Sequence, residues 1–387
     1  MKLLFFISSE GGKAAGGHFN SLHQVSQEMA KTCEVKIIML GKVLSPVLKD
    51  NPHLEEHIVL GHSLSDIFKL NSRLKQLFQS FKPDIIHCFD TNSLNRCLLS
   101  SVTSGIPLVM NKCGGRNPLK DNYQHADATV LFSKENQQWY YDSKYYDDNS
   151  IFLIPNRVRE LTILPENLQK EKAHPEKTTF VRVSRLGGAY EMTLLQTFNL
   201  LEKLSKNIQV ELFVIGRITN EERFQKLMAN GEKKNFDISY ITDERAAKGS
   251  DFLYLADFVI GTGRSFMEAT SLGIPSLTPA QNAEIPILVN ATNVEQFLAT
   301  NFSERNIAED GDEKKTLATI LKLVTDESMY AKQQKETKVF FEEYFGTSKI
   351  NQKYMEVYDF ALETPVKRIN LLRQNYLYLI KFILKGV

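Results

Sequence analysis

The sequence predicts an α/β protein made of two domains, each built around a parallel sheet, with a ligand cleft between them. Three observations carry this prediction. The chain has 387 residues, more than one core usually serves. Short apolar runs alternate with amphipathic helical patterns, as in βαβ units. A charged segment with two prolines, 160–177, interrupts this pattern. We therefore predict a first domain at 1–165, a linker at 166–177 and a second domain at 178–350.

The composition is that of a soluble globular protein, with 42% hydrophobic and 24% charged residues. The net charge of +1 gives no reason to expect a nucleic-acid partner. The four cysteines show no Cys-x-x-Cys spacing, so we expect reduced thiols in a cytoplasmic protein. The apolar run Leu3–Ile7 is shorter than a signal-peptide core and is interpreted as the first buried strand. No run is long enough for a transmembrane helix.

The first domain opens with a strand, a glycine-rich loop, a helix and a second strand. The loop carries Gly16 and Gly17. This opening resembles the first domain of GT-B glycosyltransferases, in which such a loop closes over the donor diphosphate or receives the acceptor, and a mobile surface loop is the alternative. Ser133 is the predicted N-cap of a helix that carries Trp139 and Tyr140. The predicted elements are strands at 3–8, 35–39, 85–88, 106–110, 126–132 and 151–154, with helices at 18–31 and 65–81.

The second domain repeats the alternation of strands and helices. Its predicted strands are 178–184, 210–215, 236–241, 258–260 and 274–277, and its predicted helices include 194–204, one that ends at 252–256, and 265–271. The segment 290–387 is helical by pattern.

The most informative stretch of the chain runs from Ala256 to Pro279. After the apolar strand at 258–260, Gly261 and Gly263 permit a tight turn into a helix, whose first N–H groups form an anion site. Arg264 adds a donor fork that suits phosphate. Glu268, one helical turn further, could accept hydrogen bonds from a ribose diol. The alternative is an ordinary strand–turn–helix corner that binds nothing.

This stretch resembles the nucleotide-sugar site of GT-B glycosyltransferases, in particular the large family 4 of retaining enzymes. Glu268, Ala269, Gly273 and Pro275 match the family's helix glutamate and its "small-Gly-x-Pro" end. The family has another glutamate eight residues earlier, where this chain has Ile260.

Further motifs extend the resemblance over roughly residues 1–360. Ser184-Arg185-Leu186 is similar to the family's Gly-Arg-Leu, and the family's later lysine is replaced by Tyr190 and Glu191. Gly216-Arg217 follows Val-Ile as in the turn that approaches the nucleotide, with the second glycine replaced. The exit from the first domain, Ile154 to Val158, matches Ile-Pro-Asn-Gly-Val except at Arg157.

The resemblance implies transfer of a hexose from a nucleotide-sugar, with UDP as the expected nucleotide, to a hydroxyl acceptor. It implies retention, with the leaving phosphate helping to deprotonate the acceptor, and no cofactor or metal. Arg185 and Arg264 are the candidate catalytic cations, and Lys112 is a third, with a solvated loop residue as its alternative. The candidate donor-binding residues are Gly16, Gly17, Arg185, Gly216, Arg217, Thr262, Gly263, Arg264, Ser265 and Glu268.

Arg182 is expected on the opposite strand face from its neighbours, which makes it a weaker phosphate candidate. Asp310-Gly311-Asp312 has the spacing of a metal-nucleotide pair, but it lies between helices and is interpreted as a solvated loop. No cluster has zinc spacing and no Walker sequence is present. His18 and His125 are the candidates for a histidine base, each with a structural role as the alternative.

The carboxyl terminus, 351–387, is predicted as a helix that returns to the first domain followed by a basic amphipathic tail. From Pro365 onward the tail carries five cations and no acidic residue, and Ile369, Leu372 and Tyr376 begin an apolar stripe that Leu379 and Ile383 continue. Such a tail can bind an anionic membrane or pack on the first domain. Membrane contact would place the protein on the inner face of the membrane, beside a lipid-linked glycan acceptor, in the setting of surface-polysaccharide assembly that the resemblance suggests.

Two other functional classes stay open. A UDP-sugar 2-epimerase uses the same scaffold and the same glutamate-bearing helix, but it needs acid/base carboxylates and a histidine that the sequence does not bring together. A non-catalytic sugar-nucleotide-binding protein is the other class, because the family's first glutamate and its lysine are both absent here.

Overall fold

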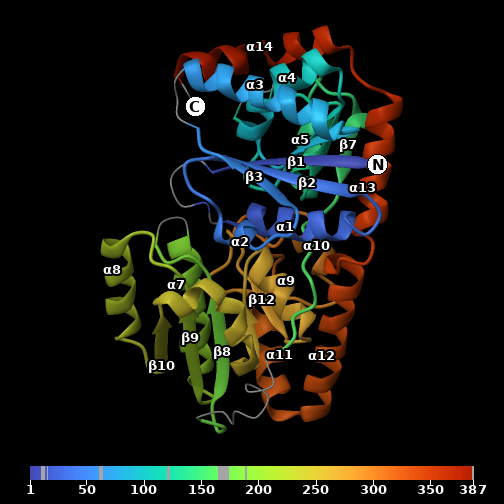
Figure 1. Cartoon of the computed structure of the whole chain (residues 1–387). Helices are drawn as coiled ribbons and strands as arrows, with labels where there is room; N and C mark the ends of the chain where they lie inside the picture. The colour runs from blue at the N-terminus through green and yellow to red at the C-terminus, as the bar shows by residue number, and fades with distance from the viewer. Residues whose placement is uncertain are drawn as a thin grey trace. The chain divides into compact units, whose positions relative to one another are not determined.

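The computed structural model describes residues 1–9, 14, 16–60, 64–119, 123–163, 174–187 and 190–385. The chain divides into two compact units: unit 1 comprises Met1–Asn156 and Thr347–Val387, and unit 2 comprises Arg157–Gly346. Figure 1 shows the elements of each unit along the chain. Most of the predicted linker, 166–177, lies outside the described residues, which resume at 174.

Unit 1 contains a seven-stranded sheet in the order β3-β2-β1-β4-β5-β6-β7, and every neighbouring pair is parallel. The strands are β1 (Lys2–Ser9), β2 (Glu34–Gly41), β3 (Leu54–Ile58), β4 (Ile85–Cys88), β5 (Leu108–Lys112), β6 (Ala128–Leu131) and β7 (Ile151–Leu153). The helices are α1 (Gly17–Met29), α2 (Pro46–Lys49), α3 (Leu64–Phe81), α4 (Thr91–Ser104), α5 (Lys134–Tyr141), the short η1 (Asp148–Ser150), α13 (Ile350–Glu363) and α14 (Arg368–Lys385).

Apolar cores cover both faces of this sheet, because successive side chains of a strand point to opposite sides. On β1, Phe5 and Ile7 pack in the core that α1 and α13 complete. Leu4 and Phe6 face the other core, which contains residues of α3, α4 and α14. The unbroken apolar run of β1 is therefore the signature of a central strand that is buried on both sides.

Unit 2 contains a six-stranded sheet in the order β10-β9-β8-β11-β12-β13, parallel except for β13. The strands are β8 (Thr178–Val183), β9 (Val210–Ile215), β10 (Asp237–Ile241), β11 (Phe258–Ile260), β12 (Ser276–Thr278) and β13 (Ile287–Leu288). The helices are α7 (Glu191–Leu204), α8 (Glu221–Gly231), η3 (Glu244–Leu255), α9 (Arg264–Ser271), α10 (Val294–Leu298), α11 (Asp312–Thr325), α12 (Glu327–Phe340) and η4 (Phe341–Phe345).

The predicted α/β class with parallel sheets is confirmed. The strand at 258–260 matches β11, and Ser133 caps α5 by accepting a hydrogen bond from the backbone N–H of Asn136. Other boundaries were displaced: the strand predicted at 274–277 is β12 at Ser276–Thr278, and the helix predicted to end at 252–256 is the 3₁₀ segment η3. The exact ends of helices and strands depend on local hydrogen bonds, which hydrophobic periodicity does not resolve.

The C-terminal segment packs on unit 1 through its last two helices. Leu371 and Asn375 of α14 are fully buried, and Asn375 exchanges hydrogen bonds with the backbone N–H (2.9 Å) and carbonyl (3.0 Å) of His125. The guanidinium of Arg368 donates to the buried carboxylate of Asp127. Arg368, expected among the lipid-facing cations, is therefore used inside the unit.

The opposite side of α14 remains exposed and apolar. Ile369, Tyr376, Leu377 and Ile380 are each about half exposed or more. Ile369 and Tyr376 belong to the predicted stripe, and Leu377 and Ile380 extend it. No helix in the described part of the chain is long and apolar enough to cross a membrane.

Candidate functional site

The candidate site of unit 2 lies where its sheet changes direction. From the central strand β8 the chain runs outward through β9 and β10, and it then returns to the other side of β8 with β11 and β12. In open α/β sheets, ligands bind outside the carboxyl ends of strands at such a switch point. Arg185 follows β8 and Thr262–Ser265 follow β11, so the structure brings both predicted groups to this edge.

The turn between β11 and α9 presents a helix N-terminus without a side-chain cap. Gly263 is the N-cap and adopts φ +50° and ψ −115°, which favours glycine. Ser265 closes the turn: its Oγ accepts from the Thr262 N–H (3.2 Å) and donates to the Thr262 carbonyl (3.1 Å). Because the first N–H groups of a helix have no intrahelical acceptor, this turn is suited to an anion.

The turn is held by a neighbouring segment, Asn301–Phe302, whose backbone is strained. Asn301 and Phe302 both have positive φ, +57° and +51°, which is uncommon for residues other than glycine. The Phe302 carbonyl accepts a 2.8 Å hydrogen bond from the Gly263 N–H, and the Phe302 ring stacks on Phe266 with centroids 4.2 Å apart. Backbone strain of this kind persists where surrounding contacts impose it, and it often marks functional sites.

Arg264 and Glu268 form an ion pair one helical turn apart on α9. The Arg264 Nε lies 2.7 Å from Glu268 Oε1. Glu268 is only 8% exposed, and burial raises the pKa of its carboxyl while the neighbouring Arg264 opposes that rise. The two side chains therefore form one unit in which each orients the other.

Arg185 is exposed and held by Tyr190. Its Nη2 donates to the Tyr190 hydroxyl at 2.9 Å, and its guanidinium carbon lies 5.0 Å from the centroid of the Tyr190 ring. Tyr190 stands where the resemblance expects a lysine. The tyrosine thus supplies no charge of its own but orients the neighbouring arginine.

Gly216 and Arg217 follow β9 at the same edge of the sheet, with different surroundings. Gly216 is buried, and a Cβ there would lie 1.6 Å from the Ser184 carbonyl oxygen. The close approach of these two chain segments is sufficient to explain the glycine at this position, and no ligand is needed for the explanation. Arg217 is exposed.

The three candidates in unit 1 are Gly16, Gly17 and Lys112. Gly16 is the N-cap of α1, which has no side-chain cap, and Gly17 is exposed. Positions 10–13 and 15 of the glycine loop lie outside the described residues.

Lys112 is buried, so the solvated-loop interpretation is wrong. Its ammonium donates to the carbonyls of Gly114 (3.0 Å) and Arg116 (3.1 Å) and to Oδ1 of Asn136 (3.1 Å). An ammonium has three N–H donors, and these three contacts hold the loop after β5. They favour a structural role over catalysis.

The histidines of unit 1 also have structural surroundings. His125 is buried and stacks on Tyr146 at 4.4 Å, and burial lowers its pKa to about 4. His87, which sequence reasoning did not single out, is fully buried between Tyr358 and Asn111, and burial lowers its pKa to about 3. His18 is half-buried at the start of α1 and its ring lies 4.2 Å from that of Phe19.

The aspartates at 310 and 312 have different environments. Asp310 is exposed, whereas Asp312 is buried in the first turn of α11 and accepts the backbone N–H of Glu309 at 2.9 Å. The solvated-loop interpretation therefore holds for Asp310 and is wrong for Asp312. Within the part of the chain that the structure describes, no group of three or more His, Cys, Asp or Glu side chains could hold a metal ion.

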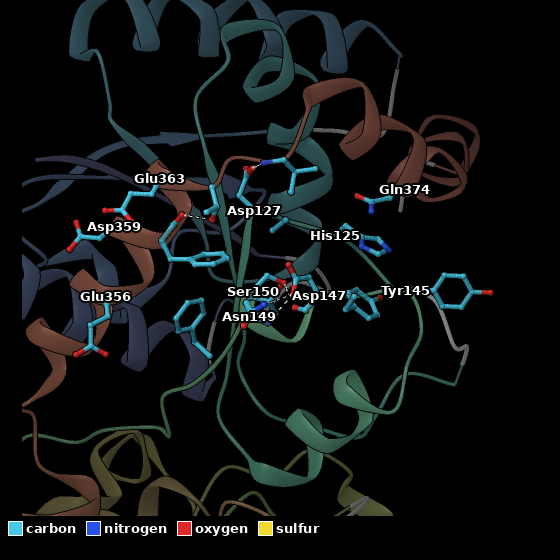
Figure 2. Close-up of a pocket in the computed structure, with 17 residues that line it drawn as sticks. His125, Asp127, Tyr145, Asp147, Asn149, Ser150, Glu356, Asp359, Glu363 and Gln374 are labelled. Atoms are coloured by element: carbon cyan, nitrogen blue, oxygen red, sulfur yellow. Dashed lines mark hydrogen bonds between the residues drawn. The ribbon is translucent and has the colours of Figure 1, made fainter.

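A cavity of about 760 Å³ lies in unit 1 between the β6–β7 edge, α13 and α14. Figure 2 shows the carboxylates of Glu356, Asp359 and Glu363 along α13, with Asp147 on the opposite side. Such an acidic lining disfavours a diphosphate. Of the predicted site residues, His125 alone lines this cavity.

Comparisons with known proteins identify the fold. No family model and no curated protein sequence matches the chain. Among solved structures, Anabaena HepE in complex with UDP and glucose is similar at 15% identity and a TM-score of 0.65, over 93% of this chain and 99% of HepE. A glycosyltransferase from Rickettsia africae is similar at 14% identity and a TM-score of 0.68, over 94% and 98% of the two chains.

The UDP-GlcNAc 2-epimerase from Neisseria meningitidis, bound to UDP-GlcNAc, is also similar, at 14% identity and a TM-score of 0.54, over 92% of this chain and 99% of that one. The identities are low, so these similarities concern the fold. The chain has the two-domain α/β fold, with parallel sheets, of GT-B glycosyltransferases and UDP-sugar epimerases.

Proposed function

We propose that this protein is a glycosyltransferase that moves a hexose from a UDP-sugar to a hydroxyl acceptor. The observation that carries the proposal is the uncapped N-terminus of α9, which lies at the switch point of unit 2 with the Arg264–Glu268 pair on its first turns and Arg185 at the end of the neighbouring strand. The similarity to structures that contain UDP and glucose supports the choice of donor.

Each residue has a role that its surroundings allow. The backbone N–H groups of α9 and the exposed Arg185 would bind the diphosphate and stabilise the charge that develops on the leaving UDP. The Glu268 carboxylate would accept hydrogen bonds from the ribose diol, while Arg264 keeps that carboxylate in place. Thr262, Gly263 and Ser265 shape the turn.

The mechanism we propose is retaining and independent of metal. Cationic side chains and a helix N-terminus can offset the leaving-group charge, which is the task a metal would perform. The leaving phosphate would assist deprotonation of the acceptor, so no separate protein base is required. The structural surroundings of His125 and Lys112 agree with this arrangement, since neither is available as a base without loss of its packing or hydrogen bonds.

We further propose a lipid-linked glycan as the acceptor, in surface-polysaccharide assembly, with the protein peripheral on an anionic membrane. The exposed apolar residues of α14 and the cations of the same tail support this proposal. The acceptor would then be delivered in the plane of the membrane.

A UDP-sugar 2-epimerase is the second candidate, because the Neisseria epimerase shares the fold. It requires acid/base groups around the reacting carbon. In unit 2 the described histidine is His174, which is exposed and lies 3.4 Å from Glu176. This pair belongs to the start of unit 2, before β8, and not to the carboxyl edge of the sheet. The transferase is therefore the better-supported function.

The test is incubation of the protein with UDP-glucose, UDP-galactose and UDP-N-acetylglucosamine, followed by chromatography of the products. Slow release of UDP that accelerates with a glycan acceptor supports a transferase. Formation of an isomeric UDP-sugar supports the epimerase, and tight binding without any turnover supports a non-catalytic protein. Glu268→Gln serves as the variant with weakened donor binding, and Glu222→Gln, which alters an exposed glutamate of α8, serves as the matched control.

A further inference from the structure

Arg182 is an arginine buried in the middle of the unit 2 sheet, and no counter-ion for it is found in the part of the chain that the structure describes. It is the fifth residue of the central strand β8 and has no exposed surface. Its Nη2 donates to Thr193 Oγ at 2.6 Å, but its Nε and Nη1 have no hydrogen-bond partner. Among the described residues, no carboxylate forms an ion pair with it.

An unpaired buried cation is costly, because burial removes the hydration of the charge. Burial lowers the pKa of Arg182 to about 10, which leaves the guanidinium protonated at neutral pH. Apolar neighbours surround it on the same sheet face, among them Phe180 and Leu194. A position that serves packing alone would be better filled by an apolar side chain. The positive charge therefore indicates that an anion from outside the chain binds nearby.

The guanidinium is directed at the N-terminus of α7. Its bonded partner, Thr193, lies in the first turn of this 14-residue helix and also donates to the Tyr190 carbonyl at 2.8 Å. The N-cap Tyr190 provides no side-chain cap. Glu191, the acidic residue of the same turn, lies 3.7 Å from Arg223. Arg182 therefore adds positive charge to a helix end that is already positive.

The same turn lies beside Arg185 at the switch point. Tyr190 is hydrogen-bonded to Arg185 through its side chain and to Thr193 through its backbone. Arg264, in contrast, is partly neutralised by Glu268. Arg264 alone therefore does not replace the positive charge of the lysine that the resemblance expects at the position of Tyr190.

We infer that Arg182 is a second cation of the diphosphate site, which attracts the phosphates of the donor through the first turn of α7. This inference rests on the proposed UDP-sugar site. In a low-dielectric interior the attraction is weakly screened, so a buried charge can act on a ligand at the surface of the turn. Because uridine lacks phosphates, Arg182 should affect binding of UDP and leave binding of uridine unchanged.

The experiment compares UDP and uridine binding by calorimetry in the wild type and in Arg182→Met, which keeps a long side chain without the charge. Loss of a buried charge that attracts the phosphates across one helical turn should weaken UDP binding by about 10- to 100-fold. Uridine binding should stay within about twofold, and the unfolding midpoint of the ligand-free variant should equal or exceed that of the wild type. Lys226→Met, which removes an exposed cation of α8, is the matched control and should change neither affinity.

Other results would overturn the inference. A lower midpoint with equal weakening of UDP and uridine would make Arg182 a packing residue. No change in either affinity would mean that an internal water satisfies its free N–H groups. If Arg182→Met does not fold, Thr193→Val provides the same comparison, since it removes the hydroxyl that directs the guanidinium. An unchanged ratio of UDP to uridine affinity in Thr193→Val would refute the inference.

A failure of the proposed function can be told apart from a failure of this inference. If the wild type binds neither UDP nor uridine, inorganic pyrophosphate becomes the probe. Pyrophosphate binding that Arg182→Met weakens by tenfold or more would keep the anion site while the UDP-sugar assignment falls. Absence of pyrophosphate binding by the wild type would overturn both.

Discussion

Glu268→Gln is the most direct test of the ribose role, because the side chain keeps its shape and loses only its charge. In the wild type, the Arg264 Nε lies 2.7 Å from Oε1 of the Glu268 carboxylate and orients it. Hydrogen bonds to a charged group contribute about 1.5–3 kcal/mol. Uridine binding should therefore weaken by roughly 10- to 150-fold in the variant.

The pH dependence follows from the raised pKa of Glu268. Burial raises this pKa above the ordinary value of 4.5, so protonation begins at a higher pH than for an exposed glutamate. As the pH falls from 7 toward that pKa, the charged acceptor is lost and uridine affinity should fall. Without ligand the sign is opposite: the protonated form favours folding, and this stabilisation is lost as the pH rises through the folded-state pKa.

The assay is calorimetry with uridine between pH 7 and pH 5, because uridine carries no phosphate whose own titration would interfere. The variant should show weak binding with little pH dependence. Glu222→Gln is the matched control, since Glu222 and Lys226 form an exposed pair with the same spacing on α8. A variant that binds uridine as the wild type does at pH 7 would refute the ribose role.

Three further predictions concern the phosphates, metal and lipid. Arg185→Ala should lower turnover by roughly 10²–10³ and leave the unfolding midpoint nearly unchanged, because the side chain is exposed; near-normal turnover would assign Arg185 to another role. Chelation by EDTA should leave activity intact, and a requirement for manganese or magnesium would contradict the metal-independent mechanism. Replacing Tyr376 and Leu377 with serine should reduce sedimentation with anionic liposomes at low salt while the protein stays folded, since both side chains are exposed; equal sedimentation would argue against lipid contact.

The structure changes how the lipid experiment must be designed. Removing the whole tail after Glu363 would also remove Arg368, whose partner Asp127 is buried, and Asn375, which is bonded to His125. A truncated chain would leave a buried carboxylate unpaired, which is strongly destabilising. Substitutions on the exposed side of α14 separate lipid contact from packing.

The sequence was sufficient for the elements around the switch point, because they depend on local rules. The apolar run of β11 and the glycines after it define the turn without reference to the rest of the chain. The Arg264–Glu268 pair also follows from their spacing, since residues four apart lie on one helix face. It was missed because each residue had been assigned a ligand of its own.

The contacts that could not be predicted join residues far apart in sequence. Lys112 donates to Asn136, which is 24 residues away, and Arg368 donates to Asp127, which is 241 residues away. Periodicity describes which face of a strand or helix is apolar, and it does not say which polar side chains meet across the fold. The solvated-loop alternative for Lys112 and the lipid-facing position expected for Arg368 are therefore both contradicted by their buried partners.

The balance of charge at the unit 2 site depends on which cations have partners. Arg264 forms an ion pair with Glu268, which partly neutralises its charge. Arg185 is bonded only to the neutral Tyr190 among the partners that the structure describes. Arg182 has no acidic partner among the described residues. A bound diphosphate would thus be attracted by the exposed Arg185 and the buried Arg182, neither of which is paired with a described carboxylate. The N-termini of α7 and α9 would add to this attraction. If this balance is correct, the loss of the lysine is offset by Arg182 from within the sheet, and Arg264 serves mainly to hold Glu268 for the ribose.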